Sequence, residues 1–323
     1  MAANTVTEAG STSSVPSIHN QGRKALFRKQ LRRYWQLYLM VLLPLLYIIV
    51  LKYIPMLGVQ IAFKEYNIVK GMWGSDWVGL QYFKQFFSSP NFYPILINSL
   101  EISLVTLIFN FPAPIILALF LNEIRTGFFK NTVQMVTYAP HFISTVVMSG
   151  MILLFLSPTG EIGKLFNILG LVPVNFLGIA DDFKYVYALT DMWQHMGYAS
   201  IIYLAALSGI NPDLYEAARV DGASRFKKML HIDLPGIMPV IVILLILGTG
   251  DVLNVGFEKT YLLQNNLNLP GSEVIATYVY KVGLINANYS YSTAIGVFNS
   301  IITFVLLILV NWIARRTSEH SLW

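Results

Sequence analysis

The chain contains six long, continuously apolar runs, and these constrain its fold more than any other feature of the sequence. A helix needs about 20 mostly apolar residues to cross the hydrocarbon core of a bilayer. The runs lack the alternating polar face that marks the strands of a membrane barrel, so they predict helices. The predicted spans cover residues 35–57, 99–121, 132–156, 184–207, 236–257 and 291–314.

The composition excludes a water-soluble enzyme. Charged residues make up 12% of the 323 residues and apolar residues 55%, whereas soluble domains carry about 25% charged residues. So few charges cannot cover a surface that faces water. The sequence therefore predicts an all-α integral membrane protein with six transmembrane helices.

Lysine and arginine residues predict the orientation of these helices. They cluster at 23–33, 125–130, 219–228 and 315–316, which lie on one side of the membrane if the spans alternate. Because cytoplasmic loops carry an excess of basic residues, both termini are predicted to be cytoplasmic. A cleaved signal peptide is the alternative for the first run, but a long polar and basic segment precedes it and no cleavage site follows.

No motif for catalysis or nucleotide binding is present in the sequence. Residues 160–164 lack the spacing of a phosphate-binding loop and the Ser or Thr that follows its lysine. There is no H-E-x-x-H or G-x-S-x-G motif and no cysteine. We therefore expect neither an enzyme nor a resident cofactor or metal. His141, His195 and His231 are interpreted as interfacial or hydrogen-bonded residues.

The predicted cytoplasmic loop, residues 208–235, has the signals of a short and well-capped helix. Asn211 is a favourable N-cap, Pro212 suits the first helical position, and Asp213 lies where the helix dipole favours an acid. Gly222 can adopt the left-handed conformation that ends a helix. A second helix is predicted to follow and to end just before the next span.

One pattern in this loop has two fixed spacings. Glu216-Ala217-Ala218 is followed after three residues by Gly222, and after nine more by Ile232-Asp233-Leu234-Pro235. The pattern resembles the EAA-x3-G-x9-I-x-L-P signature of the permease subunits of binding-protein-dependent ABC importers. An ordinary amphipathic loop helix is the alternative, but it would require neither the spaced glycine nor the terminal I-x-L-P.

Further short segments extend the resemblance over nearly everything from Pro55 to the C-terminus. They are GL-x2-F at 79–83, NSL at 98–100, ALFLNEIR at 118–125, PHFIS at 140–144 and IYLAA at 202–206. Together they resemble the carbohydrate-uptake group of these permeases, which has a MetI-like core, and within it the LplB-like oligosaccharide and polysaccharide permeases.

The resemblance implies a set of partners. Two permeases, here expected to be distinct, each contribute a five-helix core. Two separate ATPase subunits would bind ATP and Mg²⁺, and a lipid-anchored or periplasmic solute-binding protein would deliver an oligosaccharide from outside. The location implied is the bacterial plasma (inner) membrane.

The resemblance also divides the chain. Residues 96–314 would form the permease core, with the signature loop at 208–235. Residues 23–95 would form a basic anchor, a first transmembrane helix and an outside loop. Residues 1–22 are predicted to be a disordered cytoplasmic tail and residues 315–323 a cytoplasmic C-terminal tail.

The loop helix is similar to the coupling helix that binds in a groove of the ATPase. By position, Glu216 would pair with a basic residue there, Ala217 and Ala218 would permit close approach, and Gly222 would set the turn. The residues expected to couple to the ATPase are Tyr215, Glu216, Ala217, Ala218, Asp221, Gly222, Leu234 and Pro235.

Polar and aromatic residues near the spans are candidates for the solute path. Polar groups in the hydrocarbon zone usually face the bundle interior or a water-filled path, and sugars bind to aromatic faces combined with polar groups. The candidates are Tyr138, Asp191, Trp193, Tyr198, Asp251, Asn254 and Phe257. For each residue alone, interfacial anchoring or helix–helix hydrogen bonding is the alternative interpretation. The alternative function is an ion-gradient-driven secondary transporter, whose inverted repeat is not visible in this sequence.

Overall fold

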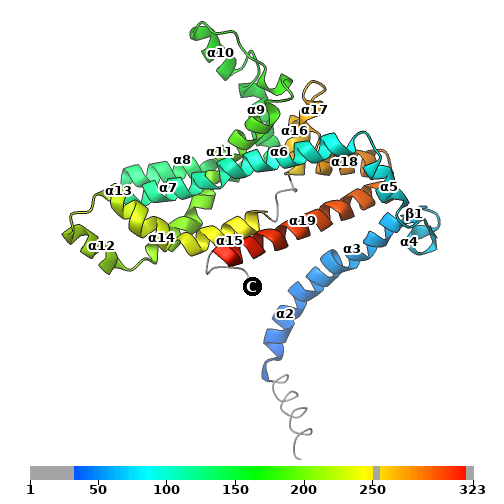
Figure 1. The fold of residues 1–323 in the computed structure, drawn as a ribbon, viewed down its shortest axis with the longest axis horizontal. Coiled ribbons are helices and arrows are strands. Elements are labelled where there is room, and N and C mark those ends of the chain that lie inside the picture. The colour runs from blue at the N-terminus through cyan, green and yellow to red at the C-terminus, as the bar shows by residue number, and fades with distance from the viewer. Residues whose placement is uncertain (1–32, 250–254, 318–323) are drawn as a thin grey trace, which may run out of the picture. The chain divides into compact units, whose positions relative to one another are not determined.

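The computed structural model describes residues 33–249 and 255–317 of the chain (Figure 1). The chain divides into two units, residues 1–58 and 59–323, and each is described by itself. The described residues are mostly helical. A small antiparallel pair joins β1 (Lys64–Glu65) to β2 (Asp76–Trp77).

The first unit contains one continuously apolar helical segment. It consists of α2 (Trp35–Ile48), a π-helical turn η1 (Ile49–Tyr53) and α3 (Ile54–Met56). Prolines at positions 44 and 55 lack the N–H group that a regular helix uses. A membrane helix tolerates this because local adjustments such as a π-helical turn satisfy the freed carbonyl groups.

The second unit contains the remaining elements. The 3₁₀ turn η2 (Leu57–Phe63) crosses the boundary between the units. The first half of the second unit then comprises, in chain order, α4 (Gly71–Gly74), α5 (Gln81–Phe87), α6 (Phe92–Asn110), α7 (Pro112–Glu123), α8 (Phe128–Tyr138), η3 (Ala139–Phe142), α9 (Thr145–Phe155), α10 (Glu161–Ile168) and η4 (Phe176–Gly178).

The second half of this unit begins with its central helix. Its elements are α11 (Phe183–Ser208), α12 (Pro212–Val220), α13 (Arg225–Lys228), η5 (Met229–Asp233), α14 (Leu234–Gly236), α15 (Met238–Thr249), α16 (Phe257–Leu263), α17 (Leu269–Ser272), α18 (Ile275–Tyr280), η6 (Lys281–Ile285) and α19 (Tyr289–Thr317).

The helix α11 organises the second unit. It packs along α6 and α7 and also contacts α8, η3 and α15 (Figure 1). At Gly197, an added Cβ atom would lie 2.0 Å from the backbone oxygen of Thr137 in α8. Only a residue without a side chain lets the two backbones come this close, as at the small-residue contacts of membrane helices.

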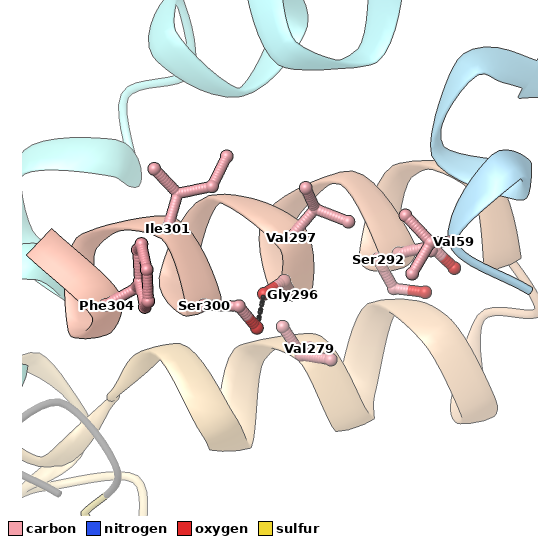
Figure 2. A pocket seen from close by; sticks show the side chains of 9 residues that line it. Val59, Val279, Ser292, Gly296, Val297, Ser300, Ile301 and Phe304 are labelled. Atoms are coloured by element: carbon pink, nitrogen blue, oxygen red, sulfur yellow. Dashed lines mark hydrogen bonds between the residues drawn. The ribbon is translucent and has the colours of Figure 1, made fainter. Parts of the chain in front are cut away.

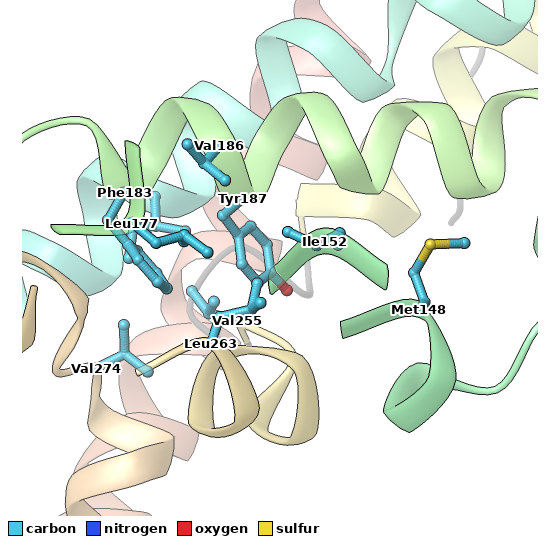
Figure 3. Close-up of a cluster of buried hydrophobic side chains, with 10 residues drawn as sticks. Met148, Ile152, Leu177, Phe183, Val186, Tyr187, Val255, Leu263 and Val274 are labelled. Carbon is cyan, nitrogen blue, oxygen red and sulfur yellow. The ribbon is translucent and has the colours of Figure 1, made fainter. Parts of the chain in front are cut away.

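Clusters of buried apolar side chains join these helices. The first surrounds Phe183 and Tyr187 of α11 and includes Ile152 of α9 and Leu263 of α16 (Figure 3). A second joins α7, α11 and the segment from η5 to α15, and a third joins α5, α6, α18 and α19. The first cluster therefore ties α11 to two elements that flank the polar site described below.

A groove of about 620 Å³ runs along α19 (Figure 2). The small residues Ser292, Gly296 and Ser300 line it at four-residue intervals, and Val279 of α18 and Phe304 border it. The Ser300 hydroxyl donates to the Gly296 carbonyl at 2.9 Å, so this polar group is satisfied within its own helix. Small residues at this spacing permit close packing of membrane helices.

One predicted span is bent, and a second bend lies where another predicted span begins. The run at 132–156 forms α8 with η3, then α9, and the two parts meet at 104°. Pro140 lacks an N–H group, and the extended Ser144 accepts a hydrogen bond from the Val147 N–H at 3.3 Å, which starts a new helix. Residues 225–236 likewise meet α15 at 59°. Continuous hydropathy cannot reveal such breaks, because it records composition and not direction.

By length and composition, three described helices can cross a membrane, or up to five segments if each bent pair is one span. The three are Trp35–Phe63, Phe92–Glu123 and Tyr289–Ile313. The predicted fourth span coincides with α11, which has 26 residues and is about 39 Å long at 1.5 Å per residue. Its more polar sequence keeps it outside this set, so its crossing stays a prediction. The tail at 1–22 and the end of the predicted fifth span, 250–254, lie outside the described residues.

Candidate functional site

A polar cluster centres on Asp191, near the middle of α11. The Lys259 ammonium of α16 donates to Asp191 Oδ1 at 3.0 Å, and the Asn110 amide at the end of α6 donates to Oδ2 at 2.6 Å. The side chain of Lys259 is 5% exposed and that of Asp191 is 17% exposed. Two charges removed from water in this way depend on each other for compensation. The ion pair and the Asn110 hydrogen bond therefore tie α6, α11 and α16 together.

Two histidines and a tyrosine extend this cluster. His195 Nε2 lies 3.8 Å from Asp191 Oδ1, and His195 Nδ1 lies 3.0 Å from Nδ1 of His141 in η3. One of these two nitrogens must carry the proton that they share. The His141 ring also stacks on the Tyr198 ring, with centroids 4.0 Å apart. We name the α11 cluster by its six residues, Asn110, His141, Asp191, His195, Tyr198 and Lys259.

The sequence places these groups by ending helices beside α11. Asn110 is the last residue of α6, two residues before the proline that begins α7. His141 lies in η3, the turn that separates α8 from α9. Asp191, His195 and Tyr198 follow one another at intervals of four and three residues, so they share one face of α11.

A second group of side chains lies on α16 and α18. The Phe257 ring centroid is 5.6 Å from that of Tyr261 and 4.9 Å from that of Tyr280. Phe257 is 37% exposed and Tyr261 is 36% exposed, so part of their ring faces is accessible. We name these three residues the aromatic cluster. Lys259 belongs to the same helix, α16, and links it to the α11 cluster.

The predicted path residues do not form a single cluster in the structure. Asp191 and Tyr198 lie in the α11 cluster, and Phe257 lies in the aromatic cluster. Trp193 follows Asp191 by two residues, about 200° around the helix. Its side chain, 42% exposed, is therefore on the face of α11 opposite Asp191.

The remaining three predicted path residues give less information. Tyr138 is the last residue of α8 and is partly buried. Asp251 and Asn254 lie outside the described residues.

Sequence reasoning missed Lys259. It lies just beyond the predicted fifth span, 236–257, and is not among the candidates for the solute path. No local signal marks it as a paired residue, because its partner lies 68 positions away in the chain. The interpretation of His141 and His195 as hydrogen-bonded residues is confirmed, although the sequence does not indicate that they bond to each other.

The helix predicted in the loop is present as α12. Its N-cap Asn211 accepts a hydrogen bond from the Asp213 N–H at 3.0 Å. The chain leaves the helix at Gly222, which has a φ of 68°, and the Ala223 N–H donates to the Ala218 carbonyl at 2.9 Å. This is the Schellman arrangement, which satisfies carbonyl groups that the helix end would leave free.

The signature residues are largely accessible in this chain. The helix α12 has no buried residue. Leu234, Tyr215 and Ala218 are partly buried, and Gly222 is exposed beyond the end of α12. The other members of the predicted coupling set, all exposed, are Glu216, Ala217, Asp221 and Pro235.

Tyr215 connects α12 to η5. Its hydroxyl donates to Asp233 Oδ1 at the end of η5, and the Asn122 side chain in the last turn of α7 lies near it. Burial first, and then the hydrogen bond to Asp233, raise the pKa of Tyr215 above its ordinary value. The hydroxyl therefore remains a donor throughout the neutral range. Neither Asp233 nor Asn122 was singled out from the sequence.

The groups present in the two clusters define the kinds of ligand that they could bind. Within residues 33–249 and 255–317, no group of three or more His, Asp or Glu could hold a metal ion. The clusters offer amide, imidazole and phenol groups together with accessible ring faces. Such a combination suits a ligand that presents both hydroxyl groups and an apolar face.

Comparison with known proteins identifies the family. Residues 90–319 match the family described as binding-protein-dependent transport system inner membrane component. The chain is 43% identical over 303 residues to protein LplB of Bacillus subtilis (strain 168), covering 94% of this chain and 95% of LplB. It is 42% identical over 302 residues to the polygalacturonan/rhamnogalacturonan transport system permease protein YteP of the same strain, covering 93% and 94%.

A solved structure agrees with this assignment. A chain of a bacterial ABC transporter involved in the import of the acidic polysaccharide alginate matches with a TM-score of 0.83 and 38% identity, covering 90% of this chain and 99% of that chain. None of these comparisons supports the secondary-transporter alternative. The chain therefore belongs to the family of binding-protein-dependent transport system inner membrane components, and it is a mostly helical, multi-pass permease subunit of an ABC importer with the MetI-like fold.

Proposed function

We propose that the chain forms half of the membrane pathway for an oligosaccharide that a binding protein delivers from outside. The observation that carries this proposal is the α11 cluster. It places a stacked His141–Tyr198 pair next to a hydrogen-bonded ion pair, on the helix around which the unit is built. Ring faces and hydrogen-bonding groups are the features that hold a sugar.

The first substrate class to test is the uronate-containing oligosaccharides. Two similar proteins carry acidic saccharides in their descriptions: YteP for polygalacturonan and rhamnogalacturonan, and the transporter for alginate. In this chain, His141 and His195 supply imidazole nitrogens at the same point of α11, beside the Lys259–Asp191 pair, and these suit a carboxylate as well as a hydroxyl group.

Uptake by the reconstituted importer tests this function. The permease is assembled with its second permease, both ATPase subunits and the binding protein in liposomes. Galacturonate, alginate and neutral oligosaccharides of equal length are then compared. We expect ATP-dependent uptake of an acidic saccharide. Uptake that continues without the ATPase subunits and stops when ion gradients are dissipated would contradict the proposal.

Substitutions in α11 decide which face of the helix lines the pathway. Tyr198→Ala removes the ring that stacks on His141, and we expect uptake to fall about tenfold, equivalent to about 1.4 kcal/mol. Trp193→Ala is the matched variant, because it removes an aromatic ring from the opposite face of the same helix. A larger loss in Trp193→Ala than in Tyr198→Ala would place the pathway on the other face.

We propose that α12 is the coupling helix that docks in a groove of the ATPase subunit. Its exposed surface and its caps at both ends support this role, since a rigid helix without buried residues presents itself to a partner. Glu216 would pair with a cation of the groove, and Gly222 would turn the chain so that α13 returns toward the membrane.

Two substitutions in α12 test the docking. Loss of one partner from a desolvated charge pair costs about 2–5 kcal/mol, and a β-branched residue in the left-handed region costs about 1–2 kcal/mol. Glu216→Ala and Gly222→Val should therefore abolish transport and stimulated ATP hydrolysis while the permease still inserts. Gly222→Asn is the control, since asparagine tolerates this conformation.

Crosslinking tests the contact directly. A cysteine at Ala218 should crosslink to one placed in the ATPase groove, and the crosslink is specific on the permease side because the chain has no native cysteine. Normal transport by both variants, without any crosslink, would refute docking.

The topology that we propose has six crossings, with α11 as the additional one, and both termini in the cytoplasm of a bacterial cell. Residues 96–314 form the five-helix core, and residues 23–95 add the anchor, the first helix and an outside loop. The basic clusters at 125–130 and 219–228 support this orientation, because both then lie in the cytoplasm.

A further inference from the structure

Three elements of the second unit meet at one side chain, Tyr215. The residue lies on α12, and its hydroxyl donates to Asp233 at the end of η5. The Asn122 side chain, in the last turn of α7, lies near the same hydroxyl. Because η5 continues through α14 into α15, Tyr215 is linked to the segment that leads into α15.

Asp233 is an unusual residue to find beside an exposed helix. It is 0% exposed. Its second carboxylate oxygen, Oδ2, has no hydrogen-bond partner among the described residues. A buried carboxylate is costly unless it is hydrogen-bonded, so the Tyr215 hydroxyl supplies a large part of its compensation. The π-helical turn η5 brings Asp233 to this position, and such turns are frequent at functional sites.

The surroundings of Asp233 are closely packed. Met229 and Leu234, on either side of it, belong to the apolar cluster that includes the end of α11. An added Cβ atom at Gly236 would lie 2.6 Å from Ile210 Cδ1, so the two residues are in close contact. The segment is therefore packed against its neighbours. By contrast, α12 buries none of its own residues, so its link through Tyr215 is one of the few rigid connections it has.

We propose that Asp233 is a positioning residue that locks Tyr215, and through it α12, to the η5–α15 segment. A displacement of α12 is then passed through one hydroxyl group to this segment. Since α15 contacts α11, the displacement reaches the helix that carries the α11 cluster. The inference rests on the proposed docking of α12 on the ATPase subunit.

Spin-label distances in the complete importer test this lock. Labels are placed at Val220→Cys on α12 and Leu247→Cys on α15, which are 88% and 48% exposed. Their distance is compared without nucleotide and with ATP, Mg²⁺ and vanadate. With Tyr215 intact, α12 and α15 move together and the distance stays constant. With Tyr215→Phe, which removes only the hydroxyl, the fraction of molecules whose distance changes should rise about fivefold, the effect of one buried hydrogen bond.

Matched variants separate positioning from a general loss of structure. Tyr93→Phe makes the same chemical change at an exposed tyrosine and should leave the distance constant. Asp233→Asn keeps an acceptor oxygen and should resemble the unchanged chain, whereas Asp233→Leu should resemble Tyr215→Phe. The double variant Tyr215→Phe/Asp233→Leu should be no worse than either single variant, because both remove one contact.

The outcomes distinguish this inference from the docking proposal. If Ala218→Cys crosslinks to the ATPase but Tyr215→Phe keeps a constant distance, the lock is refuted and docking stands. If Asp233→Asn and Asp233→Leu behave alike, the lock is refuted as well. If no crosslink to the ATPase forms in any variant, the docking proposal itself fails.

Discussion

Asp191 is the residue on which most of the polar site depends, because three side chains approach its carboxylate. Asp191→Asn leaves the Lys259 ammonium, 5% exposed, without a counter-charge. Breaking a buried pair from one side costs about 3–5 kcal/mol. We expect Asp191→Asn and Lys259→Met each to lower the thermal unfolding temperature of the assembled permease strongly. The double variant removes both charges and should recover much of the loss. Additive losses in the double variant would show that the pair is not the unit of stability.

Among the elements, the contact between α11 and α8 is the one most sensitive to a single methyl group. An added Cβ at Gly197 would lie 2.0 Å from the Thr137 backbone oxygen, and backbone cannot rotate away as a side chain does. Gly197→Ala should therefore separate the two helices, at a cost of about 1–3 kcal/mol. It should also reduce the yield of monodisperse protein in size-exclusion chromatography. Gly150→Ala in α9 is the control, because nothing lies within 4 Å of the added atom. Equal yields from the two variants would contradict this account of the packing.

For the whole molecule, the prediction that follows from the basic clusters is an even number of crossings with both ends inside. Loops rich in basic residues are found in the cytoplasm, and Arg315 and Arg316 lie in the last turn of α19. A C-terminal fusion to an enzyme that is active only outside the cytoplasm should therefore be silent. The same fusion to a fluorescent protein should give a signal in cells. The opposite result would contradict an even number of crossings with both ends in the cytoplasm.

The sequence by itself determined the features that depend on short stretches of chain. Long apolar runs predicted helices, and the first predicted span and α2 to α3 coincide because continuous apolarity requires no partner. Asn211 and Gly222 predicted both ends of α12, since a cap is a contact between residues a few positions apart. The spaced signature at 216–235 led to the family that the comparisons then showed.

Only the tertiary structure decided what the polar residues contact. The charge on Asp191 was visible in the sequence, but its pairing with Lys259 joins positions 68 apart, and no local pattern encodes a partner at that distance. The same holds for His141 with His195 and for Asn110 with Asp191. Trp193 and Tyr198 are close in the sequence, yet helical geometry places them on different sides of α11. A buried polar group in a membrane protein is satisfied by whichever helix packs beside it, and that choice is made by the fold as a whole.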